Sequence, residues 1–104
     1  MKFLYMFLSL ISVQVYGAEH LVSQKGKAFD KSDLSIKVGD SIKFINEDDT
    51  AHHLMYKIDG KRFSHKQKNG DVEGSAVVQN FSTAGDYTIR CAIHPKMKLK
   101  LTVQ

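Results

Sequence analysis

Apolar and polar residues alternate along several short segments of the chain, which is the pattern of half-buried β-strands. The segments with this pattern or with a short apolar run are residues 34–38, 41–45, 52–59, 76–81, 87–91 and 99–103. Turn-forming residues separate them, namely Gly39-Asp40, Asp59-Gly60 and Ala84-Gly85-Asp86. Several short strands between regular turn signals predict an all-β fold, either a sandwich or a barrel.

The segment 65–75 is polar and contains glycine, and we expect it to form a long loop. No stretch shows a convincing helical period, although residues 64–69 could hold one turn. The single proline, Pro95, lies outside every predicted strand. Proline in a strand interior would remove a hydrogen bond of the sheet, so its position agrees with the all-β prediction.

The first residues have the pattern of a secretory signal peptide. Lys2 supplies a positive charge, residues 3–16 are mostly apolar, and the small residues Gly17 and Ala18 follow. The apolar stretch is short for a membrane-spanning helix, which needs roughly 20 residues. We therefore expect a signal peptide over residues 1–17, with cleavage after Ala18 or an uncleaved anchor as the alternatives.

Residues 18–104 are enough for one domain. The chain contains one cysteine, so no internal disulfide forms, and a free thiol in an oxidising compartment is unusual. A metal ion would both occupy that thiol and stabilise so small a domain. The net charge is +4, and removal of Lys2 with the leader leaves +3. The basic residues form no stripe typical of nucleic-acid binding, and their excess favours an acidic protein partner.

Potential metal ligands lie on one short segment, where Cys91, His94 and Met97 have the spacing C-x2-H-x2-M. Soft sulfur ligands select copper, and two histidines, one cysteine and a distant axial methionine define a blue-copper electron-transfer site. The second histidine has to come from elsewhere, and the pair His52-His53 can supply it. We therefore predict that His52, Cys91, His94 and Met97 bind one copper ion that alternates between Cu(I) and Cu(II).

The strand alternation tests this hypothesis independently. Cys91 shares a strand face with Tyr87 and Ile89, and Met97 extends the face of Leu99 and the later apolar residues. His52 has the parity of the apolar residues Leu54, Tyr56 and Ile58, whereas His53 has that of Met55, Lys57 and Asp59. We therefore expect His52 to point inward toward Cys91 and His53 to point away.

Two surroundings of the predicted site follow from the sequence. Asn46 precedes the loop to His52, and we expect it to tie the two ligand loops together. We expect the His94 ring to reach solvent within a small apolar patch of Ala92, Ile93 and Pro95, where electrons would leave. Lysines would rim this patch, which favours an acidic partner; they are Lys96, Lys98 and Lys100.

Other interpretations of the same residues remain open. Cys91 could be an enzyme nucleophile with a histidine base, but no orienting group is evident. A structural zinc site would normally bring more cysteine or histidine ligands, and Met97 could simply fill the core. His65 lies in a run of basic residues, and we expect it at the surface.

A second copper site is a further hypothesis. Cleavage after Gly17 would leave Ala18-Glu19-His20 at the N-terminus, and an amine, two amide nitrogens and an imidazole suit square-planar Cu(II). The alternative is that His20 belongs to a frayed terminus.

The chain resembles the cupredoxins, the family that includes plastocyanin, pseudoazurin and amicyanin. The resemblance spans about residues 20–104 and is carried by Val38-Gly39-Asp40, Phe44-Ile45-Asn46, the Asn46-x5-His52 spacing, Gly85-Asp86-Tyr87 and Cys91-x2-His94-x2-Met97. The short gap before Met97 is similar to amicyanin, and the double histidine resembles a bacterial group described as methylamine-utilisation-like. The family often has asparagine where this chain has His53, and commonly glycine where it has Leu99.

The resemblance implies a Greek-key β-sandwich, a type 1 copper ion and electron transfer in the periplasm. The ligand positions of the family fall on His52, Cys91, His94 and Met97. The expected protein is a monomeric electron carrier and not an enzyme, with transient redox partners such as acidic proteins or c-type cytochromes and no stable attachment to membranes. A copper-handling protein, either a metallochaperone or a store, is the alternative function.

Overall fold

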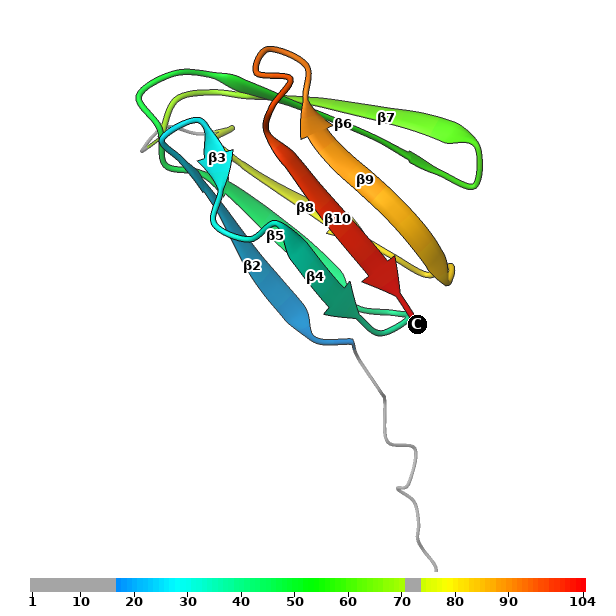
Figure 1. The fold of residues 1–104 in the computed structure, drawn as a ribbon. Helices are drawn as coiled ribbons and strands as arrows, with labels where there is room; N and C mark the ends of the chain where they lie inside the picture. Colours follow the sequence, from blue (N-terminus) through cyan, green and yellow to red (C-terminus); the bar gives the residue numbers. More distant parts are fainter. Residues whose placement is uncertain (1–16, 71–73) are drawn as a thin grey trace, which may run out of the picture.

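The computed structural model describes residues 17–70 and 74–104, and the predicted leader over residues 1–17 lies outside this range except for Gly17. Two β-sheets pack face to face as a sandwich (Figure 1). The strands are β2 (Glu19–Lys25), β3 (Ala28–Phe29), β4 (Asp33–Ile36), β5 (Ser41–Asn46), β6 (His52–Ile58), β7 (Lys61–Gln67), β8 (Ala76–Asn80), β9 (Gly85–Cys91) and β10 (Lys98–Val103). The described residues contain no helix, so this part of the chain has no helix long and apolar enough to cross a membrane.

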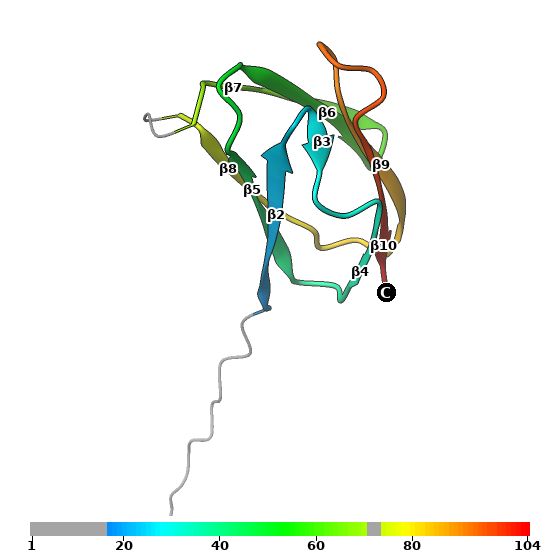
Figure 2. The same cartoon turned by 60° about the vertical axis from the view of Figure 1, so that its left-hand side comes forward.

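The two sheets combine parallel and antiparallel neighbours. One has the order β4-β10-β9-β6-β7 and the other the order β3-β2-β5-β8. The pairs β4–β10 and β2–β5 are parallel, and the remaining pairs are antiparallel. Figure 2 shows the two layers from the side, with the loop between β9 and β10 extending beyond one end. The all-β sandwich predicted from strand alternation is thus confirmed.

Strand alternation produces the core. In β5 and β10 every second side chain is buried, so that Ile42 and Phe44 face Leu99 and Leu101 across the sandwich interior. The buried cluster consists of Val22, Ile36, Ile42, Phe44, Leu54, Tyr56, Phe81, Ile89, Leu99, Leu101 and Val103. These residues lie between the sheets and beneath the end at which Cys91 terminates β9.

The segment after the Asp59-Gly60 turn departs from the prediction. Asp59 and Gly60 both have positive φ, 53° and 77°, as a two-residue hairpin turn requires. Strand β7 then pairs with β6 along its whole length, from Ile58↔Lys61 to His52↔Gln67. The expected loop therefore begins at Lys68 and not at residue 65, and the expected helical turn at 64–69 is wrong. Its polar composition concealed β7, because only alternate side chains face the interior.

Candidate metal centre

The ends of two paired strands bring the candidate ligands together. His52 is the first residue of β6 and Cys91 the last residue of β9, and Leu54 lies opposite Cys91 in the ladder. The loop after Cys91 is closed by backbone hydrogen bonds from the Cys91 N–H to the Met97 carbonyl (3.2 Å) and from the Met97 N–H to the His94 carbonyl (2.9 Å). This short loop turns His94 back over the strand ends.

Three donor atoms form a small triangle. Cys91 Sγ lies 3.6 Å from His52 Nδ1 and 3.7 Å from His94 Nδ1, and the two nitrogens are 3.2 Å apart. The point equidistant from the three atoms lies about 2.0 Å from each, the product of the three sides divided by four times the triangle's area. This distance is close to the roughly 2.0–2.3 Å between zinc and its nitrogen and sulfur ligands in proteins. One metal ion at this point would therefore touch all three donors.

The chemistry of the donors fits copper. A thiolate and two imidazoles form the trigonal set of blue-copper sites. Cys91 and His52 are each 1% exposed, so protein surrounds these two donors. Met97, 2% exposed, is also buried at this end of β10. Its role as the fourth ligand stays a prediction.

The backbone around Cys91 joins the two ligand segments. The His53 N–H donates a hydrogen bond to Cys91 Sγ at 3.3 Å, and the Ala92 N–H donates to the His53 carbonyl at 2.8 Å. The side chain of His53 points away from the site and contacts the Ser64 hydroxyl. His52 and His53 therefore have the orientations that strand parity predicts. The backbone hydrogen bonds of residue 53 join the two ligand segments, although the asparagine that the family often has at this position is absent.

His52 has a second partner that sequence reasoning missed. Its Nε2 atom lies 2.6 Å from Asp48 Oδ2. Asp48 also accepts hydrogen bonds from the backbone N–H groups of Gly26 (2.6 Å) and Lys27 (3.0 Å). Burial acts to raise the pKa of Asp48, but the hydrogen bonds from His52, Lys27 and Gly26 outweigh it and lower the pKa below its ordinary value.

This contact selects the tautomer of His52. A carboxylate only accepts hydrogen bonds, so the proton of the neutral ring lies on Nε2 and leaves Nδ1 free to face Cys91. The sequence signal was an aspartate four residues before the histidine, within the acidic run Glu47-Asp48-Asp49. That run gives no indication which of the three carboxylates turns inward.

Asn46 has partners other than those expected. Its amide nitrogen donates to the carbonyls of Thr50 (2.9 Å) and Lys68 (2.8 Å), and its amide oxygen accepts the Asp48 N–H at 2.9 Å. Asn46 thus shapes the turn that carries Asp48 and joins it to the end of β7. The expectation that Asn46 ties the two ligand loops is wrong, because its side chain hydrogen-bonds to Asp48, Thr50 and Lys68 and not to residues 92–97.

His94 lies at the molecular surface. Its ring is half-buried and packs edge-on against the His52 ring, with centroids 4.9 Å apart. Ala92, Ile93 and Pro95 around it are exposed, Ile93 to 54%. The apolar patch predicted around His94 is therefore present.

His65 is not a surface residue, which corrects another expectation. It is partly buried on the inner face of β7, its ring 5.7 Å from Tyr56 and 6.5 Å from Phe63 between centroids. The alternation of β7 decides this, because Phe63, His65 and Gln67 share the inward face. Its basic neighbours Arg62 and Lys66 lie on the opposite face.

The groups of the hypothetical N-terminal copper site have another partner. Asp40 accepts hydrogen bonds from the Ala18 N–H (2.9 Å), the His20 ring (2.9 Å) and the Lys37 N–H (3.0 Å). The His20 hydrogen bond contributes most, followed by that of Lys37, and together they lower the pKa of Asp40 from 3.8 to about 2. Glu19 and His20 also belong to β2, whose pairing with β5 holds them extended. The second copper site stays a hypothesis that would have to disrupt these contacts.

Comparisons with known proteins agree with this site. A sequence profile of copper-binding proteins, plastocyanin/azurin family, matches residues 18–104. The oxidised state of a proline-to-alanine variant of amicyanin has a TM-score of 0.72 and 26% sequence identity, covering 85% of this chain and 83% of that chain. A reduced tryptophan-to-tyrosine variant of amicyanin has the same TM-score and identity, covering 90% and 88%.

Amicyanin from Paracoccus versutus, with a TM-score of 0.70, 20% identity and coverage of 90% and 87%, shares the fold. The search of curated protein sequences gave no match. The matched range 18–104 contains all four candidate ligands.

Proposed function

Because this chain belongs to the plastocyanin/azurin family of copper-binding proteins, we propose that it is a one-electron carrier between redox proteins of the periplasm. Residues 1–17 would direct export, and the mature chain would begin at Ala18. The observation that carries the proposal is the triangle of Cys91 Sγ, His52 Nδ1 and His94 Nδ1. Copper bound there supplies the exchange of one electron between Cu(I) and Cu(II).

The protein's part is to hold the donors still. Small movement of the ligands between two oxidation states lowers the cost of electron transfer, and a pre-shaped site provides this. Backbone hydrogen bonds hold the 91–97 loop, and Asp48 holds the His52 ring. The N–H of His53 stabilises negative charge on Cys91 Sγ, which tunes the reduction potential.

The burial of the donors favours a carrier over a copper-handling protein. A metallochaperone needs ligands that a partner can reach, whereas Cys91 and His52 are 1% exposed. Only His94 reaches the surface, within the apolar patch of Ala92, Ile93 and Pro95. A redox partner docked briefly there would exchange an electron through the His94 ring, as weak redox encounters use small interfaces.

The optical spectrum of the copper-loaded protein tests the proposal. We expect an intense blue band that bleaches on reduction, returns on oxidation and is absent from the zinc-loaded control. Cys91→Ser should abolish the band, because the thiolate is its source. A colourless protein that binds Cu(I) and readily releases it to a chelator would overturn the carrier and support copper handling.

A further inference from the structure

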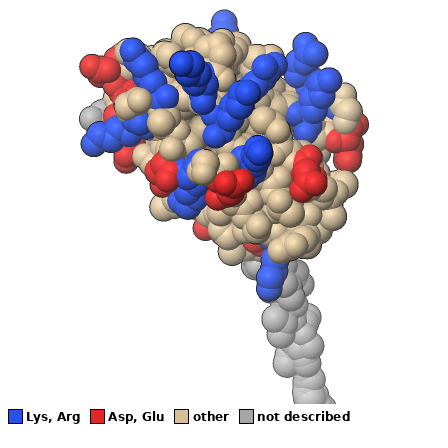
Figure 3. All heavy atoms as spheres, viewed as in Figure 1, with Lys and Arg blue, Asp and Glu red and all other residues tan. Residues whose placement is uncertain are grey.

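The outward face of the five-stranded sheet is strongly basic. Ladder partners point to the same side of a sheet, so the register identifies the side chains of this face. Its exposed cations are Lys57, Arg62, Lys66, Arg90, Lys98 and Lys100, and its carboxylates are Asp33 and Asp86. Figure 3 shows lysine and arginine side chains gathered over the upper half of one face, the end that carries the 92–97 loop.

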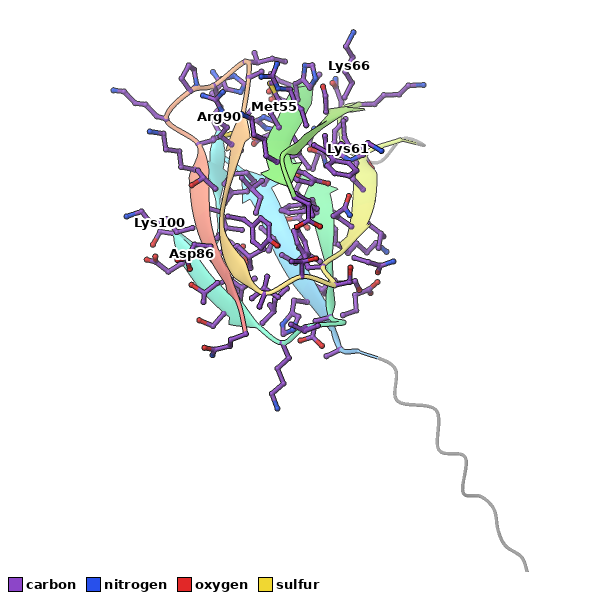
Figure 4. The ribbon with its side chains drawn as sticks, turned by 90° about the vertical axis from the view of Figure 1, so that its right-hand side faces the viewer. Met55, Lys61, Lys66, Asp86, Arg90 and Lys100 are labelled. Atoms are coloured by element: carbon purple, nitrogen blue, oxygen red, sulfur yellow. The ribbon has the colours of Figure 1, made fainter. Side chains whose placement is uncertain are left out.

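These cations are available to a partner. Within the two described ranges, none of the six forms an ion pair with a carboxylate. Asp86 accepts a hydrogen bond from Thr102 at 3.3 Å and lies toward the end of β9 distant from Cys91. Figure 4 shows Arg90, Met55 and Lys66 near the end of the sheet at which Cys91 terminates β9, here called the copper end, with Asp86 farther away.

A cleft opens in the middle of this face. Strands β6 and β9 pair only at Leu54↔Cys91 and Met55↔Arg90, and beyond this point they diverge. A cavity of about 370 Å³ lies between them, lined by Met55, the cations Lys57, Arg62 and Arg90, and one carboxylate, Asp86. The cations outnumber the carboxylate three to one, so the cleft is positively charged on balance. Arginine binds carboxylates through two parallel hydrogen bonds, so two arginines at one cleft suit an acidic side chain.

We propose that this face docks an acidic protein partner, with the cleft between β6 and β9 receiving one of its aspartate or glutamate side chains. The inference rests on the proposed carrier function and names the surface that a redox partner uses beyond the apolar patch around His94. Arg90 directly precedes Cys91 in β9, so a partner held at the cleft lies next to the copper end. Complementary charge would orient and accelerate such an encounter while leaving it weak.

A protein fits this face better than other polyanions. The cleft is recessed, so a protruding side chain enters it, whereas the headgroups of a bilayer form a broad surface. Asp33 and Asp86 interrupt the cations of this face, a mixed pattern of charge that a protein surface can match and the uniform phosphates of a nucleic acid cannot. The half-buried Met55 adds an apolar contact that an acidic protein surface can match.

Nuclear magnetic resonance of the Cu(I) protein tests the proposal, with hexaglutamate as the probe. We expect amide shifts in β6, β7 and β9, centred on Met55, Arg62 and Arg90, that weaken as salt is added. The double variant R62Q/R90Q should weaken peptide binding by roughly three- to tenfold. The matched control K25Q/K43Q removes the same charge from lysines of β2 and β5 in the other sheet and should bind like the wild type.

Other results would overturn the proposal. Equal weakening by both double variants would show attraction by net charge alone. Shifts confined to residues 92–97 would place docking at the loop only. Equal affinity for inorganic phosphate would make the cleft a site for free anions, and shifts induced only by phosphatidylglycerol vesicles would identify a membrane. The blue band of each preparation is measured in the Cu(II) state before it is reduced for resonance measurements, so a failure of the carrier function is distinguishable from a failure of this docking surface.

Discussion

Asp48 Oδ2 lies 2.6 Å from His52 Nε2, on the side of the ring opposite the atom that faces Cys91. The carboxylate is itself held by the N–H groups of Gly26 and Lys27, at the turn between β2 and β3. The orientation of a copper ligand in β6 therefore depends on a turn more than 20 residues earlier in the chain.

We expect Asp48→Asn to weaken copper binding about tenfold, the lower end of the range for losing an outer partner of a metal-ligating histidine. The amide offers two possible partners to the ring and no charge, so the tautomer of His52 is less well defined. Competition with a copper chelator measures the affinity. Asp49→Asn is the matched control, because Asp49 is an exposed neighbour of the same charge. Equal losses in both variants would contradict the role of Asp48.

Replacing the two adjacent histidines should have different effects on the blue band. His52→Ala removes a corner of the donor triangle and should abolish the blue band of the copper-loaded protein. His53→Ala should leave the band nearly unchanged, because position 53 contacts Cys91 and Ala92 through its backbone only. Absorption spectra of both variants with one equivalent of Cu(II) decide this. Loss of colour in His53→Ala alone would reverse the assignment.

The cluster at Asp40 should make stability depend on acid pH. Its folded-state pKa of about 2 lies below the ordinary 3.8. Stability from Asp40 is therefore fully present above about pH 4 and is lost as the pH falls toward 2. Asp40→Asn should be less stable than the wild type at pH 6, and this difference should shrink below pH 4. Denaturant unfolding across this range gives the difference, from which effects common to both proteins cancel. A difference in stability that stays constant from pH 6 to pH 2 would contradict the stabilising role of ionised Asp40.

Two leucines provide a matched test of the core. Leu54 is completely buried and lies opposite Cys91 in the pairing of β6 with β9, whereas Leu21 is 55% exposed. We expect Leu54→Ala to lower the free energy of unfolding by about 3 kcal/mol through lost burial and a residual cavity. Leu21→Ala should cost less than about 0.5 kcal/mol, as surface substitutions usually do. Chemical denaturation of both variants measures the contrast, and similar losses would refute the assigned burial.

Local alternation made much of the architecture predictable. The strand segments from residue 34 onward, with the exception of β7, and the inward parity of Cys91 and Met97 depend on a period of two residues. The Asp59-Gly60 hairpin turn follows from the local preferences of these two residues. The same period distinguishes His52 from His53. The predicted spacing of Cys91 and His94, with His52 from a second strand, matches the triangle of donors.

Strands whose inward side chains are polar escaped this reasoning. In β7 the inward residues include His65 and Gln67, and in β2 they include Gln24. Gln24 and Gln67 are fully buried and hydrogen-bond to each other at 2.7 Å. A polar side chain in the interior gives no hydrophobic signal, and its burial is possible only because the opposite sheet supplies the partner.

Strand parity and ligand type are local properties, so the fold class and the three donors that could hold one metal ion follow from the sequence alone. The surroundings of these donors depend on the tertiary structure: Asp48 behind His52, Asn46 on the carbonyls of Thr50 and Lys68, and the cleft between β6 and β9. Each of these depends on segments distant in the chain whose relative position is set when the two sheets pack and twist.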